Sequence, residues 1–142
     1  MKMALPWPPS LNHYWRNFRG RTVISEEGKT FRASVCAILN GGGPRQPPAG
    51  GRVGLLMDAF PPDRRSRDLD NLLKAVADAL KTHRDRSGRV VWPGVYEDDS
   101  QIDLLVVRRR GQVHYGQVEV EIVDLPLARC PLCGAPVQPE DN

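Results

Sequence analysis

Two aspartates and a lysine lie close together in a stretch of the chain that is rich in arginine. Residues 64–80 read RRSRDLDNLLKAVADAL, with Asp68 and Asp70 two positions apart and Lys74 four positions after Asp70. Carboxylate oxygens are the hard ligands that Mg²⁺ takes in proteins, and arginine binds phosphate through its paired N–H donors. Carboxylates among phosphate-binding groups indicate a metal-dependent enzyme that cleaves phosphodiesters, because a metal-bound water can attack phosphorus.

The same stretch also has a simpler interpretation as an ordinary helix start. Its apolar residues recur at helical spacing and predict a helix from about residue 68 to residue 83. They are Leu69, Leu72, Leu73, Val76 and Leu80. In this interpretation Asp68 is the N-cap, and Asp70 forms a surface salt bridge with Lys74 that is worth about 0.3–0.5 kcal/mol. On these residues alone the simpler interpretation is favoured.

Three further observations favour the metal site. An N-cap residue has non-helical dihedrals, so Asp68 can share a ligand with Asp70, although neighbours at i and i+2 within a helix point about 200° apart. Arginines and backbone N–H groups at the helix start both attract anions. A second acidic cluster, YEDDSQID at residues 96–103, lies between a loop and a strand, where loops place chemistry on a rigid frame. Spacing does not choose among its acidic members, Glu97, Asp98, Asp99 and Asp103.

The positive charge of the chain is clustered. There are 20 Lys and Arg residues against 17 Asp and Glu residues, so the net charge is only +3 and its distribution carries more information. Arginines gather at residues 16–21, 64–67, 84–89 and 108–110, which favours a nucleic-acid-binding surface. Aromatic residues lie among the arginines of the first cluster, which fits either DNA contact or an ordered loop whose aromatics fill the core.

The remaining chain predicts a mixture of strands and helices. Residues 25–40 read as a helix with Ser25 as the N-cap and acidic residues in the first turn. The start of the chain is an expected edge strand, because the prolines of LPWPP exclude a helix or a central strand. Residues 52–60 are another strand candidate, and two more extend over residues 100–110 and 115–125.

The last two strands, joined by a turn around Gly111, are predicted to pair with each other as a hairpin. The second of them alternates apolar and polar residues, which is typical of a sheet with one face in water. Residues 41–51 are rich in glycine and proline and predict a loop, and residues 84–95 predict another.

Length and composition fit one ordinary domain. The chain has 142 residues, of which 40% are hydrophobic, enough to bury a core. No apolar run approaches the roughly 20 residues that span a bilayer, and the N-terminus lacks the apolar segment of a signal peptide. The three cysteines are too few, and odd in number, for a secreted disulfide framework. These features predict a soluble, cytoplasmic protein that does not bind a membrane.

The sequence resembles the RusA family of Holliday-junction resolvases in several separated segments. The most specific is RDLDNLLKA at residues 67–75, and DDSQI follows at the distance and in the order that the family shows. The likeness extends over roughly residues 3–123. Its segments are LPWPPSLNHYWRNFRGR at 5–21, SEEGKTFR at 25–32, PPDRRSRDLDNLLKAVADAL at 61–80 and EDDSQID at 97–103.

This resemblance implies a fold, an activity and a set of site residues. The fold is α/β (α+β), a two-layer domain over residues 1–125 in which a mixed β-sheet packs with two main helices, and the protein is a homodimer. The activity is Mg²⁺-dependent, with Mn²⁺ able to substitute, and nicks four-way DNA junctions symmetrically. Asp68, Asp70 and Asp99 are the implied catalytic metal ligands and Lys74 the catalytic lysine, with Asn71 beside them. The expected DNA contacts are Asn12, Arg16, Arg19, Arg21, Arg65 and Arg67.

Two other functions stay open on the sequence alone. One is a protein that binds branched DNA without cutting it, and the other is a less selective nuclease of branched DNA. The acidic residues and Lys74 argue against the first, because a protein that only binds phosphate gains nothing from carboxylates that face it.

Two segments depart from the family pattern. The segment at residues 82–96 is longer than expected between the helix and Asp99, and is either a plain loop or a DNA-contacting insertion. The proline-rich tail at residues 126–142 carries Cys130 and Cys133 in CPLCG, like one half of a zinc ribbon. Because a structural zinc site needs four ligands, the sequence favours two free thiols over a zinc site.

Overall fold

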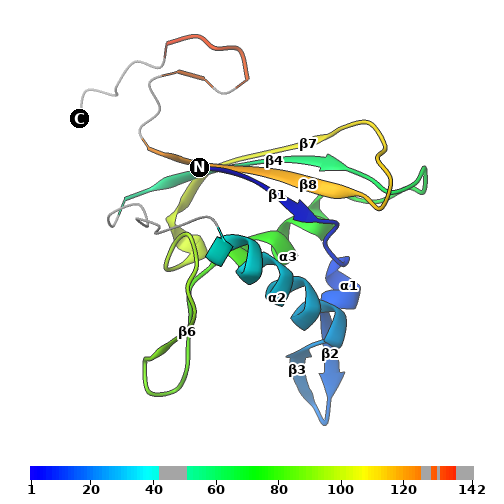
Figure 1. The fold of residues 1–142 in the computed structure, drawn as a ribbon, viewed down its shortest axis with the longest axis vertical. Coiled ribbons are helices and arrows are strands. Elements are labelled where there is room, and N and C mark those ends of the chain that lie inside the picture. Colours follow the sequence, from blue (N-terminus) through cyan, green and yellow to red (C-terminus); the bar gives the residue numbers. More distant parts are fainter. Residues whose placement is uncertain (42–50, 126–128, 131, 137–142) are drawn as a thin grey trace.

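The computed structural model describes residues 1–41, 51–125, 129–130 and 132–136. Figure 1 shows one sheet with helices packed against one of its faces. The predicted loop at residues 41–51 therefore lies almost wholly outside the described residues. No helix of the described part is long and apolar enough to cross a membrane.

A mixed four-stranded sheet is the frame of the domain. Its spatial order is β1-β8-β4-β7, in which β8 is antiparallel to both of its neighbours and β4 is parallel to β7. The strands are β1 (Lys2–Pro6), β4 (Val53–Phe60), β7 (Ile102–Arg109) and β8 (Gln117–Asp124). Together with the two main helices, this sheet confirms the predicted α/β class of two layers.

The predicted hairpin between the last two strands is wrong, because β4 lies between β7 and β8 (Figure 1). The connection after β7 passes over the end of β4, where Arg110 donates its N–H to the carbonyl of Ala59 at 2.8 Å. Period-two alternation identified β8 as a strand but does not specify its partner. Strand β4 has the pattern of a central strand, because it is apolar along most of its length and buried on both faces.

Two helices cover the inner face of the sheet. Helix α2 (Glu26–Gly41) begins as predicted, because the Ser25 hydroxyl accepts the N–H of Gly28 at 3.0 Å. Helix α3 (Asp70–Leu80) is shorter than predicted at both ends. The prediction of Asp68 as N-cap is wrong, since Leu69 occupies that position and no side chain caps the helix.

The small elements lie around this frame. They are helix α1 (Leu11–Tyr14), strands β2 (Trp15–Phe18) and β3 (Arg21–Ile24), strands β5 (His83–Arg84) and β6 (Val90–Trp92), and the 3-10 helix η1 (Asp99–Gln101). The pair β2–β3 forms one hairpin and β5–β6 another. The prediction of a plain loop over residues 84–95 is therefore wrong, because a two-stranded ribbon lies there.

The aromatic residues near the N-terminus divide between the core and the surface. Tyr14 is fully buried between the helices and the sheet, whereas Phe18 is 53% exposed at the tip of the β2–β3 hairpin. The two interpretations of this segment, core filling and DNA contact, thus apply to different residues of it.

Candidate active site

A line of polar side chains follows one face of α3 and the residues at its two ends. Its members recur every three or four positions, so they share that face; they are Asp68, Asn71, Lys74, Asp78 and Lys81. The Asn71 amide lies 3.5 Å from an oxygen of Asp68, and the Lys74 ammonium lies 3.0 Å from an oxygen of Asp78. We call this set the polar face of α3.

The second acidic cluster meets this face at Lys74. Asp99, which begins η1 just before β7, places one oxygen 2.8 Å from the Lys74 ammonium and the other 3.2 Å from the Lys81 ammonium. The hydrogen bond from Lys74 lowers the pKa of Asp99, and the same bond raises the pKa of Lys74. Two clusters that are 25 positions apart in the chain therefore form one site.

The four acidic candidates of the second cluster have different partners. Asp98 caps η1 through the N–H of Ser100, and it pairs with Lys81 at 2.5 Å. Glu97 pairs with Arg84, and Asp103 pairs with Arg52 on the surface. Asp99 is the member that contacts Lys74, and the choice of the residue that serves the chemistry stays a prediction.

The long segment before Asp99 does not displace it, because the two ends of the segment are bonded together. The N–H of Val95 donates to the carbonyl of Leu80 at 2.7 Å, and the N–H of Thr82 donates to the carbonyl of Tyr96 at 2.8 Å. The buried Tyr96 hydroxyl donates to the carbonyl of Ala77 at 2.8 Å. Residues 83–94 thus leave α3 and return to it, and their length has no effect on where Asp99 lies.

Asp78 is a residue whose role the sequence did not reveal. It is the one charged side chain that is buried among the described residues, at 8% exposure. One of its oxygens contacts Lys74, and the other is buried without a hydrogen-bond partner in the described part. A charged residue inside the apolar run AVADAL was the available signal, because a buried carboxylate is costly unless it has a partner.

An open groove of about 460 Å³ lies beside the start of α3. It is lined by Trp7, Pro8, Pro9, Ser10, His13, Arg65, Ser66, Arg67, Asp68, Asn71 and Leu72. The groove brings the N-terminal proline segment, the arginine-rich loop and the first carboxylate of the polar face together. It is therefore the hollow in which arginine side chains lie beside an acidic residue of the polar face of α3.

Arg65 and Arg67 were both predicted to contact DNA, but they differ in how firmly an ion pair holds each side chain. Arg67 forms a two-point ion pair with Asp63 at 2.6 and 2.8 Å and lies over the Trp7 ring, 5.7 Å from its centre. Its side chain is 24% exposed, whereas that of Arg65 is 84% exposed. Arg67 holds the loop together, whereas Arg65 has only a longer contact with Asp63, at 3.8 Å, and its side chain extends into the surroundings.

The other predicted DNA contacts lie on the α1–β2–β3 segment. Asn12, Arg16, Arg19 and Arg21 are all exposed there, and the guanidinium groups of Arg16 and Arg19 lie 5.8 and 5.3 Å from the centre of the Phe18 ring. Arg19 has φ +50° in the turn. The hairpin therefore presents several cations and one aromatic ring to the surroundings, a combination that suits a DNA strand.

The carboxylates suit a hard cation in their chemistry. Asp70 is exposed at the first turn of α3, and Mg²⁺ keeps several waters and needs only one or two carboxylates. The structure does not gather Asp68, Asp70 and Asp99 into one metal-binding group; within the described ranges no three His, Cys, Asp or Glu side chains are arranged that way. It brings together Asp99 with Lys74 and Asp68 with Asn71.

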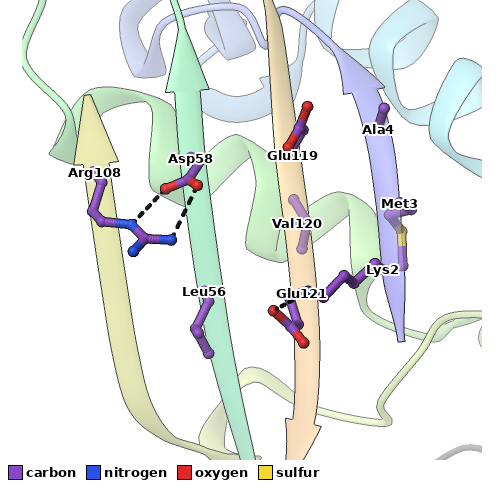
Figure 2. Close-up of a pocket in the computed structure, with 9 residues that line it drawn as sticks. All are labelled: Lys2, Met3, Ala4, Leu56, Asp58, Arg108, Glu119, Val120 and Glu121. Atoms are coloured by element: carbon purple, nitrogen blue, oxygen red, sulfur yellow. Dashed lines mark hydrogen bonds and ion pairs between the residues drawn. The ribbon is translucent and has the colours of Figure 1, made fainter. Parts of the chain in front are cut away.

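A second hollow, of about 330 Å³, lies on the face of the sheet that the helices leave open. Figure 2 shows side chains from all four strands around it. Most of its charged groups pair with one another, Arg108 with Asp58 at 2.6 Å and Lys2 with Glu121 at 3.2 Å. It holds none of the residues of the polar face, so the groove beside α3 is the better candidate for a substrate.

Comparison with known proteins gives the family. A family model described as Endodeoxyribonuclease RusA matches residues 6–123. The chain is 37% identical over 127 residues to the crossover junction endodeoxyribonuclease rusA of Enterobacteria phage 82, covering 87% of this chain and 93% of that protein. It is 35% identical, with the same coverage, to the crossover junction endodeoxyribonuclease RusA of Escherichia coli strain K12. The chain belongs to the RusA family of endodeoxyribonucleases.

Proposed function

We propose that this protein is a Mg²⁺-dependent endonuclease that resolves four-way DNA junctions by paired, symmetric nicks. The observation that carries the proposal is the contact between Asp99 and Lys74, which joins the two acidic clusters beside a basic groove. The relatives named above are crossover junction endodeoxyribonucleases, and this likeness supports a junction-cutting activity, which we expect to act in the cytoplasm.

The residues divide the chemistry among them. Asp68, Asp70 and Asp99 are the carboxylates that would hold Mg²⁺, or Mn²⁺ in its place, through hard oxygen ligands. When bound, the ion would supply positive charge and would acidify a water for attack on phosphorus. Lys74 lies within hydrogen-bonding distance of Asp99, so its ammonium is placed to stabilise the negative charge that develops on the phosphate oxygens. Asn71 orients Asp68 through their contact at 3.5 Å.

DNA lies along the groove and the β2–β3 hairpin in this proposal. Arg65 and the exposed Arg16, Arg19 and Arg21 contact phosphates, together with Asn12, and Arg67 keeps the loop in shape. Backbone contacts of this kind position a duplex without reading its sequence. Selectivity then comes from the shape of the junction.

A homodimer is the assembly that fits this substrate. A four-way junction has approximate two-fold symmetry, and resolution requires two opposed cuts. A dimer with two-fold symmetry supplies two identical sites in opposed orientation. We therefore propose that the active protein is a homodimer.

The test is a comparison of substrates. The purified protein is incubated with a synthetic four-way junction, a flap and a linear duplex of matched sequence, each with Mg²⁺ and with EDTA. Paired symmetric nicks in the junction alone, lost with EDTA, are the expected result. Tight junction binding without cuts would make the protein a non-catalytic binder, and equal cutting of the flap or the duplex would make it a less selective nuclease.

A further inference from the structure

The last described residues of the chain form a narrow turn around Cys130 and Cys133. The N–H of Cys130 donates to the carbonyl of Ala135 at 2.8 Å, and the N–H of Gly134 donates to the carbonyl of Cys130 at 2.9 Å. Gly134 has φ +73°, a left-handed conformation that glycine adopts without steric cost. Cys130 and Gly134 thus close a turn through their backbones, and both Cys130 and Cys133 are free thiols.

This turn places the two cysteines in one compact segment, because the backbone hydrogen bonds of Cys130 close it on both sides. Two cysteines separated by two residues in such a turn are the arrangement from which one half of a tetrahedral thiolate site is built. Cys130 is half-buried and Cys133 is exposed, so a metal ion can reach both.

We propose that Cys130 and Cys133 are half of a tetrahedral zinc site that a second copy of this chain completes. Thiolates are soft ligands that select Zn²⁺ over hard cations, and a structural zinc ion takes four ligands. The chain has three cysteines, and the third, Cys36, is buried within α2. The described residues of one chain offer no third ligand beside the pair, so an identical pair from another copy is the simplest completion.

The zinc site lies outside the nuclease domain. The family match ends at residue 123, and the sheet ends with β8 at Asp124, before the cysteines. A shared zinc ion would therefore tie two subunits together without contributing to the chemistry of the polar face of α3. The inference uses the homodimer of the proposed function but not its cleavage reaction.

A pair of nearby thiols can also serve thiol–disulfide exchange. Redox pairs of this spacing commonly place the reactive thiol at the N-terminus of a helix, whose dipole stabilises the thiolate. Here the described residues after Cys133 form a turn and an isolated β-bridge between Arg129 and Pro136. This difference favours metal binding, and the experiment below separates the two.

The test is the zinc content and mass of the full-length protein, purified without chelators. Elemental analysis should give about one zinc ion for two chains, and native mass spectrometry should show a dimer that carries one zinc ion. Loading with Co²⁺ should give the absorption of a tetrahedral thiolate site. Cys130→Ser and Cys133→Ser should each lose the metal, whereas Cys36→Ala should keep it; the folding of each variant is checked by circular dichroism.

Three results would overturn this inference. They are zinc bound by a single chain, no zinc at all, or a disulfide between the two cysteines detected by mass. Junction cleavage by the same samples keeps the two proposals apart. A protein without zinc that cuts junctions contradicts the shared site alone, and a zinc-bridged dimer that cuts nothing contradicts the nuclease function alone.

Discussion

Two carboxylates of different kinds hold Lys74 in place. Asp99 is partly exposed and lies 2.8 Å from the ammonium, while Asp78 is buried and lies 3.0 Å from it. A surface lysine is flexible, but an ammonium held by two ion pairs has a fixed position. Asp78 faces the core side of this arrangement, so we infer that it acts through Lys74 as a positioning residue.

Asp78→Asn should lower the rate of junction cleavage by about 10- to 100-fold, the range found when a group that orients a metal ligand is lost. The amide keeps the size of the carboxylate but carries no negative charge, so Lys74 loses one of its two ion pairs and is held less firmly. Single-turnover cleavage measures the rate, and junction binding in Ca²⁺ should stay unchanged.

A double-mutant cycle distinguishes positioning from a general structural role. If Asp78 acts through Lys74, then Asp78→Asn should add nothing to the loss caused by Lys74→Ala. Additive losses, or a large drop in the melting temperature of Asp78→Asn alone, would contradict the positioning role.

Among the elements, the closure of the segment between α3 and η1 determines where Asp99 lies. Gly94 makes this closure possible because it packs directly against the backbone of residues 80–82. A methyl group there would overlap the backbone N of Thr82 and the carbonyl carbon of Lys81, and backbone atoms cannot move aside as a flexible side chain can.

Gly94→Ala should therefore destabilise the protein by about 1–3 kcal/mol, the usual cost of overpacking, and it should also reduce cleavage by displacing Asp99. Gly111→Ala is the matched control, since nothing lies within 4 Å of a methyl group at that position. Urea unfolding of both variants gives the free energies. Equal stability of the two would show that the close approach at Gly94 has no energetic consequence.

The β5–β6 ribbon presents a surface of its own. Arg86 and Arg89 are exposed on it, and they form no ion pair among the described residues. Replacing both by alanine should leave the melting temperature unchanged, weaken junction binding, and reduce the salt dependence of that binding, because fewer phosphate contacts release fewer counterions. Unchanged binding across a salt titration would mean that the ribbon does not touch DNA.

The sequence predicted elements better than it predicted their partners. The helix that begins after Ser25 and the four strands of the sheet are confirmed, because apolar period and capping are local properties. The hairpin of β7 with β8 was wrong, since strand pairing depends on where β4 lies. Motif likeness predicted Asp99 as a site residue; the structure shows its contact with Lys74, and its catalytic role stays a prediction. The roles of Asp78 and Lys81 became evident only from their contacts in the folded structure, because sequence spacing does not reveal such contacts.

Across the whole molecule, acidic side chains are paired with cations at many points. Lys74 lowers the pKa of Asp99, Lys81 lowers that of Asp98, and Arg67 lowers that of Asp63. A carboxyl whose pKa is lower in the folded state stabilises that state above its ordinary pKa of 3.8 and loses this contribution as the pH falls below it.

The melting temperature should therefore fall steadily below about pH 4. A smaller decline should begin below about pH 6.5, because burial lowers the pKa of His83 in the folded state. Asp63→Asn should flatten this acid limb, because the Arg67 pair no longer titrates, while lowering stability at neutral pH. Calorimetry across the pH range measures both effects. An acid limb as steep as that of the wild type would show that this pair contributes nothing.

The measurement that tests the account most directly is junction cleavage by Asp99→Asn beside Asp103→Asn. Both residues belong to the same acidic cluster, but Asp99 contacts Lys74 and Asp103 pairs with Arg52 on the surface. The account predicts that Asp99→Asn binds the junction and does not cut it, whereas Asp103→Asn cuts at nearly the wild-type rate. Cleavage that survives in Asp99→Asn and is lost in Asp103→Asn would contradict the site described here.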